Sequence, residues 1–200
     1  MPSGQYFETD PAVSSRPGEV DVDVAGFRAR LMVDRGVFAA GGVDAGTLAL
    51  LKAIPPPPAG GDLLDLGCGY GPIACALAHR SPGAVVWAVD INQRALDLTA
   101  RNARALGLAG VRAVPPTGVP ETVRFAGMWS NPPIRAGKAA LHDLLAAWLP
   151  RLEPGATAWL VVHRHLGGDS LAAWLAGEGW RVSRAGSKRG YRILGVESAA

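Results

Sequence analysis

The segment that most constrains the fold begins at Leu63, where a short apolar stretch meets a glycine-rich turn and then a helical pattern. Asp65-Leu-Gly-Cys-Gly-Tyr-Gly71 joins the two parts. Three alternating glycines let the backbone turn tightly and leave room for a ligand to lie against the main chain. Ligands of open α/β sheets bind at such turns, beyond the carboxyl ends of the strands. A tight turn between strand and helix also needs glycine without any ligand, so a purely structural turn remains an alternative.

Beyond Gly61, strand-like segments alternate with helical ones. The apolar run 85–89 is typical of a strand covered on both faces, and alternating βα segments produce a parallel sheet with helices on both sides. The fold class is therefore α/β: a doubly wound, mostly parallel seven-stranded sheet of the Rossmann-like kind, with an antiparallel edge hairpin. Strands are predicted over 63–66, 85–89, 111–114, 125–130, 156–163, 180–184 and 191–196, and helices over 72–80, 93–106, 138–149 and 170–176.

The first 58 residues differ from this pattern and predict an N-terminal extension. Residues 19–34 alternate between apolar and polar side chains around a small turn, which is typical of a β-hairpin. Asp44 can cap a helix that runs to about Ala53. We therefore expect residues 1–58 to form an arm, hairpin and helix that pack on the body, and residues 59–200 to form the main domain.

The composition excludes several classes of protein. Hydrophobic residues make up 48% and charged residues 18% of 200, a globular balance. No apolar run approaches the length of a membrane span, and the N-terminus does not resemble a secretory signal. The two cysteines have neither disulfide nor metal-ligand spacing, so we expect a reduced, cytoplasmic protein without a metal. A net charge of +3 fits a polyanionic partner, but also a purely compositional excess of arginine.

A carboxylate follows the second strand of the main domain. Asp90 stands about where a ribose-binding acid is needed, although it could instead cap the next helix; Asn92 is better placed to do so. The spacing Gly-x-Gly-x-Gly differs from the dinucleotide fingerprint, and no P-loop Lys-Ser/Thr follows. Together, loop and acid predict a nucleoside cofactor without separating NAD from S-adenosylmethionine.

The fourth strand ends in Ser130-Asn131-Pro-Pro-Ile134. Two successive prolines stiffen the main chain and lack N–H groups. An Asn side-chain oxygen and a backbone carbonyl can together hold both protons of a planar –NH2 group. These two hydrogen bonds would direct the nitrogen lone pair toward an electrophilic methyl group by orientation alone. A hydride-transfer enzyme does not need this arrangement. The alternative is that Asn-Pro-Pro merely ends a strand.

These three motifs, in this order, resemble the class I S-adenosylmethionine-dependent methyltransferases that modify amino nitrogens. A closer resemblance, from about Tyr6 to Val196, is to the catalytic half of the RsmC-type ribosomal small-subunit guanine-N2 methyltransferases. It extends through Asp34-Arg-Gly-Val-Phe38 and His165-Leu-Gly-Gly-Asp-Ser170. The resemblance implies S-adenosylmethionine as cofactor, S-adenosylhomocysteine as product and ribosomal RNA, free or in a particle, as partner. Residues 59–200 would be the methyltransferase domain.

The resemblance also implies site residues. The glycines would lie against the methionine part of the cofactor, Asp65 would face its amino group, Asp90 its ribose and Ile91 its adenine. The cofactor-binding residues implied are Asp65, Gly67, Cys68, Gly69, Tyr70, Gly71, Asp90, Ile91, Thr117 and Asn131. The catalytic turn would comprise Asn131, Pro132, Pro133 and Ile134. Basic residues expected to meet RNA are Arg135, Lys138, Arg164, Lys188 and Arg189.

Two positions depart from the family pattern. Ile134 stands where many relatives have an aromatic residue that stacks on a flat base, and Thr117 stands near the place of an acid that grips the adenine amino group. The first departure keeps open a protein amide or a small-molecule amine as acceptor. The second keeps open a non-catalytic, cofactor-binding protein associated with RNA.

Overall fold

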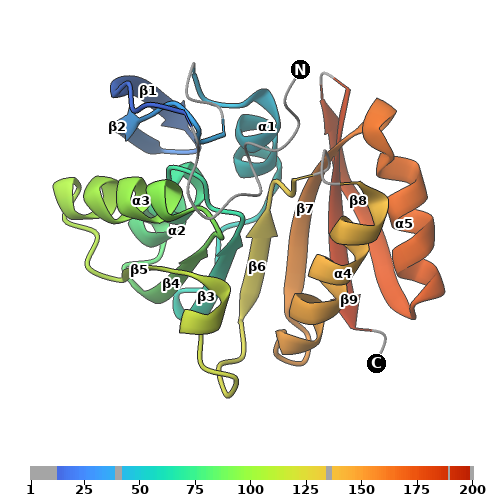
Figure 1. Cartoon of the computed structure of the whole chain (residues 1–200). Helices are drawn as coiled ribbons and strands as arrows, with labels where there is room; N and C mark the ends of the chain where they lie inside the picture. The colour runs from blue at the N-terminus through green and yellow to red at the C-terminus, as the bar shows by residue number, and fades with distance from the viewer. Residues whose placement is uncertain (1–12, 39–41, 134–136, 189, 199–200) are drawn as a thin grey trace.

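The computed structural model describes residues 13–38, 42–133, 137–188 and 190–198 (Figure 1). Its main element is a seven-stranded sheet in the order β5-β4-β3-β6-β7-β9-β8, in which β9 runs antiparallel to both of its neighbours and the other pairs are parallel. The strands are β3 (Gly60–Leu66), β4 (Gly83–Val89), β5 (Val111–Val114), β6 (Gly127–Ser130), β7 (Thr157–His163), β8 (Trp180–Lys188) and β9 (Tyr191–Ser198). This confirms the predicted fold class.

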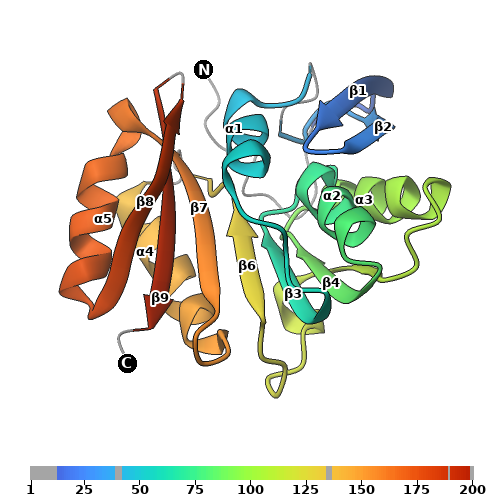
Figure 2. The same cartoon turned by 180° about the vertical axis from the view of Figure 1, so that it is seen from behind.

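Helices cover both faces of the sheet (Figures 1 and 2). Alternate side chains of β3 enter opposite cores, because successive residues of a strand point to opposite faces. Leu63 belongs to the core that also contains residues of α1, α2 and α3, whereas Leu64 belongs to the core that contains residues of α4 and α5. The helices are α1 (Ala45–Ala53), α2 (Pro72–Arg80), α3 (Gln93–Ala105), α4 (Lys138–Trp148) and α5 (Gly168–Gly177). Short 3-10 turns, η1 (Pro116–Gly118), η3 (Leu149–Arg151) and η4 (Arg164–Leu166), follow β5, α4 and β7.

The N-terminal hairpin, β1 (Gly18–Val24) and β2 (Phe27–Val33), forms a separate two-stranded antiparallel sheet. Buried Asn102 of α3 joins it to the glycine loop: its Oδ1 accepts the N–H of Met32 at 2.7 Å, and its Nδ2 donates to the carbonyls of Met32 and Tyr70 at 2.9 and 2.8 Å. The hairpin is therefore hydrogen-bonded to the main domain next to the predicted cofactor loop.

Several predicted boundaries were wrong, and two of them show how pairing partners set the limit of a strand. The strand expected over 125–130 begins only at Gly127, because Phe125 exchanges backbone hydrogen bonds with Arg151 and Glu153 after α4 and does not pair with β3. The strand expected to end at Arg184 continues to Lys188, because a bulge between Arg184 and Gly186 lets pairing with β9 resume. Among the described residues, no helix is long and apolar enough to span a membrane.

Candidate active site

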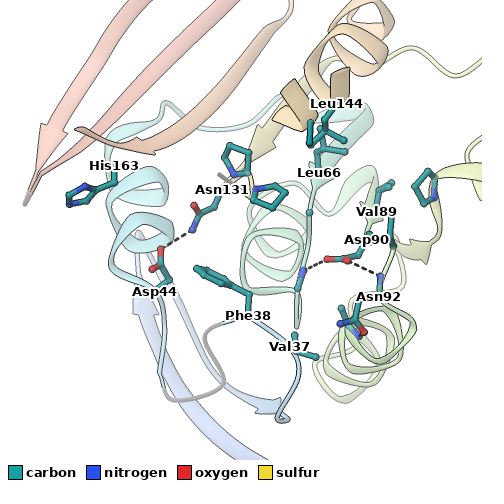
Figure 3. Close-up of a pocket in the computed structure, with 18 of the residues that line it drawn as sticks. Val37, Phe38, Asp44, Leu66, Val89, Asp90, Asn92, Asn131, Leu144 and His163 are labelled. Carbon is teal, nitrogen blue, oxygen red and sulfur yellow. Dashed lines mark hydrogen bonds between the residues drawn. The ribbon is translucent and has the colours of Figure 1, made fainter. Parts of the chain in front are cut away.

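A pocket of about 590 Å³ opens at the carboxyl ends of the parallel strands (Figure 3). β3 and β6 are neighbours in the sheet, but the strands that follow β3 lie on one side of this pair and those that follow β6 lie on the other. The pocket is at this switch point, where doubly wound sheets bind ligands. Its volume is in the range of small-molecule and cofactor sites. The predicted residues that line it are Gly67, Gly69, Asp90, Ile91, Asn131, Pro132 and Pro133.

The glycine loop is held to the end of β4 by main-chain hydrogen bonds. The N–H groups of Gly67 and Cys68 both donate to the carbonyl of Val89, at 2.8 and 3.0 Å. Gly67, Gly69 and Gly71 all have positive φ, from 57 to 90°, a backbone conformation that residues with a Cβ rarely adopt. These glycines are therefore required by the backbone path of the turn, and they also keep side chains out of the pocket floor.

Asp90 fixes the loop and faces the pocket. Its two carboxylate oxygens accept the N–H groups of Gly69 and Asn92, each at 3.0 Å, and the carboxylate retains capacity to accept from a ligand. Burial raises the pKa of Asp90, while the N–H groups of Asn92, Gly69 and Ile91 oppose that rise. Beside it Ile91 is 42% exposed, an apolar surface suited to a flat ring. Asn92, not Asp90, caps α3, by accepting the N–H of Ala95.

Asp65 lies below the loop and is fully buried. Its Oδ2 accepts the N–H of Ala74 at 2.9 Å, whereas its Oδ1 has no partner among the described residues. Burial, with a contribution from the charge of Asp90, raises the pKa of Asp65 to about 8 against the opposing Ala74 N–H. Since Asp65 does not line the pocket, its contact with a cofactor amino group stays a prediction.

Four other predicted cofactor residues lie off the pocket wall. Cys68 and Tyr70 line a small adjoining cavity, and burial raises the pKa of the Cys68 thiol well above its usual value, which disfavours a nucleophilic role. Gly71 caps α2 beneath the loop. Thr117 is exposed in η1, and its neighbour Pro116 lines the pocket instead.

The orientation of Asn131 is set by the N-terminal cap and first turn of α1, a contact that the sequence did not predict (Figure 3). Its Nδ2 donates to Asp44 Oδ2 at 2.8 Å and to Thr47 Oγ1 at 3.1 Å. Because both donor hydrogens of the amide are used in this way, Oδ1 is left to accept. Asp44 was predicted as a helix cap, which it is, but no local signal placed it beside a residue 87 positions away.

Aromatic side chains form the wall next to Asn131. His163, His165 and Tyr191 all line the pocket, and the Tyr191 ring meets the His163 ring edge-on with centroids 5.0 Å apart. Gly46 of α1 accommodates Tyr191, since a Cβ there would lie 2.7 Å from Tyr191 Cε1. Phe38, 44% exposed, lines the pocket from the segment that follows β2.

The three predicted RNA-facing cations that the structure describes do not line the pocket. Lys138, Arg164 and Lys188 are exposed, and the Arg164 guanidinium lies 3.2 Å from Nε2 of His165 at the rim. Ile134, Arg135 and Arg189 lie outside the described residues. Nearby, Arg184 and Arg192 pair with Asp169, which reduces the positive charge on this side.

Comparisons with known proteins identify the family. The family model of the methyltransferase small domain matches residues 28–195. The chain is 30% identical over 195 residues to an uncharacterized Bacillus subtilis protein, YbxB, and covers 97% of it.

Relatives with named activities are longer. The chain is 40% identical over 116 residues to the ribosomal RNA small subunit methyltransferase C of Aeromonas hydrophila, 58% of this chain and 33% of that protein. A solved 16S rRNA N2-guanine methyltransferase of T. thermophilus, in complex with AdoMet and guanosine, superposes with a TM-score of 0.79 at 25% identity, over 94% of this chain and 52% of that one. The chain thus spans a third to a half of the length of these two relatives. It belongs to the methyltransferase small domain family.

Proposed function

We propose that this methyltransferase transfers the methyl group of S-adenosylmethionine to the exocyclic N2 of guanine in small-subunit ribosomal RNA. The observation that carries the proposal is the orientation of Asn131, whose amide N–H groups are bound by Asp44 and Thr47 so that Oδ1 remains to accept an amine proton. The relatives with named activities support the acceptor, since they are small-subunit RNA methyltransferases.

The residues at the pocket fit the cofactor. Gly67 and Gly69 leave main chain open to the methionine part, Asp90 has acceptor capacity for ribose hydroxyls, and Ile91 offers an apolar face to adenine. Asp65, beneath the loop and off the pocket wall, has one buried carboxylate oxygen without a partner among the described residues, an acceptor of the kind that a bound ammonium group requires. When bound, the cofactor supplies an electrophilic methyl group on a positively charged sulfur.

The chain's own task is to hold the acceptor amine. Asn131 Oδ1 and the carbonyl oxygen of Pro132 accept its two protons, which keeps the lone pair out of conjugation with the ring and directed at the methyl carbon. The bound cofactor would supply its methyl group to this lone pair, and its sulfur would keep the electron pair of the C–S bond. The nitrogen then gives one proton to water. Orientation replaces a strong base in this scheme.

The test is transfer of labelled methyl to unmodified small-subunit RNA and particles, followed by mass spectrometry of the nucleosides. We expect N2-methylguanosine. Asn131→Ala is expected to lose methyl transfer at least about 100-fold, far more than it loses affinity for S-adenosylmethionine in calorimetry, because it removes an orienting acceptor. Transfer to protein or to a small amine but not to RNA would reject the acceptor, and full activity of Asn131→Ala would reject the mechanism.

A further inference from the structure

Asp44 has one carboxylate oxygen engaged and one directed to no described partner. Its Oδ2 accepts both the N–H of Thr47, at 3.0 Å, and Nδ2 of Asn131, at 2.8 Å. Its Oδ1 accepts no hydrogen bond from the described residues. The side chain is half-buried and lines the pocket, so a ligand there can reach it. A carboxylate oxygen has capacity for two hydrogen bonds, so this one can accept from a ligand.

The free oxygens of Asp44 and Asn131 belong to two planar groups joined by one hydrogen bond (Figure 3). The bond joins Nδ2 of Asn131 to Oδ2 of Asp44, so Oδ1 of each residue takes no part in it. Both residues line the pocket, so two free acceptor oxygens lie on its wall within one hydrogen-bonded pair. A ligand edge with two N–H donors matches two acceptors of this kind.

We propose that Asp44 determines which base is methylated, its Oδ1 accepting the ring N–H that adjoins the exocyclic amine of guanine. The inference rests on the proposed function and deepens it. Guanine carries a donor, N1–H, next to its amine, whereas adenine and cytosine carry an unprotonated ring nitrogen at the corresponding place. Asp44 would hydrogen-bond the first and repel the lone pair of the others, so selection combines attraction with rejection.

The surrounding side chains suit a flat base in this position. His163 and Tyr191 meet edge-on at 5.0 Å between ring centroids and line the same pocket as Asp44. Their rings offer apolar surface from a different part of the chain than position 134, where an aromatic residue was expected from the family pattern. The base can thus be contacted from the β7 and β9 side while Asp44 and Asn131 bind its edge.

The experiment compares two RNAs that differ only at the methylated nucleotide. Splinted ligation gives small-subunit RNA with guanine or 2-aminopurine there; 2-aminopurine keeps the N2 amine but lacks N1–H. For the wild type we expect initial rates about 10- to 100-fold higher on guanine, the size of a hydrogen bond to a charged group. Asp44→Asn keeps a helix-capping oxygen and an acceptor for Asn131 but turns a donor toward the base. In this variant we expect the preference to fall below about threefold or to reverse.

Thr47→Ala is the matched control, because it removes the second acceptor of Asn131 Nδ2 and leaves Asp44 in place. It should slow transfer to both RNAs alike and keep the wild-type preference. Undiminished preference in Asp44→Asn, or equal rates of the wild type on both RNAs, would overturn the inference while leaving the proposed function standing. No transfer to the guanine RNA by the wild type would overturn the proposed function and the inference together.

Discussion

Replacing Gly71 by alanine should damage the glycine loop through two separable effects. Gly71 caps α2 with φ of 90°, a left-handed conformation that costs a residue with a Cβ about 1–2 kcal/mol. A Cβ there would also lie 2.9 Å from both Oγ1 and Cγ2 of Thr99, which is fully buried on α3. Overpacking of this kind costs about 1–3 kcal/mol more. The total is about 2–5 kcal/mol of unfolding free energy.

Gly107→Ala separates the two effects. Gly107 has φ of 69°, but a Cβ there meets nothing within 4 Å, so only the conformational cost applies. In a chain of this size, 1 kcal/mol shifts the melting temperature by about 2–4 °C. We therefore expect Gly71→Ala to melt about 2–12 °C below Gly107→Ala in circular dichroism.

Thr99 also connects this effect to ligand binding, because its Oγ1 donates to the carbonyl of Gly69 in the loop. Calorimetry should show weaker S-adenosylmethionine binding for Gly71→Ala and wild-type binding for Gly107→Ala. The double variant Gly71→Ala/Thr99→Ser removes one of the two closest atoms and should recover part of the stability. If Gly71→Ala is no less stable than Gly107→Ala, a Cβ at position 71 does not overpack against Thr99 and the prediction is refuted.

Three further variants test polar groups in and around the glycine loop. Because the folded pKa of Asp65 is raised to about 8 from the ordinary 3.8, the folded state binds the extra proton and the free energy of unfolding falls as pH rises between those values. Asp65→Asn should flatten that slope by up to about 1.4 kcal/mol per pH unit in denaturant titrations from pH 4 to 8, and an unchanged slope would contradict the assignment. Asn102→Ala removes three hydrogen bonds that join the N-terminal hairpin and glycine loop to α3; we expect about 2–4 kcal/mol lower stability and faster hydrogen exchange at Met32, and wild-type exchange there would speak against the link. Asp90→Asn should bind S-adenosylmethionine about 10- to 100-fold more weakly in calorimetry, against no change for the exposed control Asp97→Asn; equal affinities would remove Asp90 from the ribose site.

Much of the fold was predictable because its signals are local. Pro72 after Gly71 marks the start of α2, and Asn92 before a periodic run marks the start of α3; both helices begin where predicted. Strand limits were less predictable where pairing partners decide them. Phe125 has the character of a strand residue but pairs with the loop after α4.

The residues of the candidate site were likewise predictable only where the signal is local. Glycines with positive φ, the acid after β4 and the stiff Asn-Pro-Pro turn were recognisable, since each is a property of a few consecutive residues. Whether a side chain faces the pocket was not. Asp65 and Thr117 carry suitable polar atoms, yet one is buried beneath the loop and the other is exposed outside it.

Read alone, the order of amino acids already determined the βα alternation, the helix caps and the chemistry available at each turn, because these depend on backbone preferences within a few residues. Only the tertiary structure decided that the cap of α1 orients an amide from the end of β6, with Asp44 and Asn131 87 residues apart. Strand order and helix packing set such a contact, and they arise from the burial of the whole apolar surface at once.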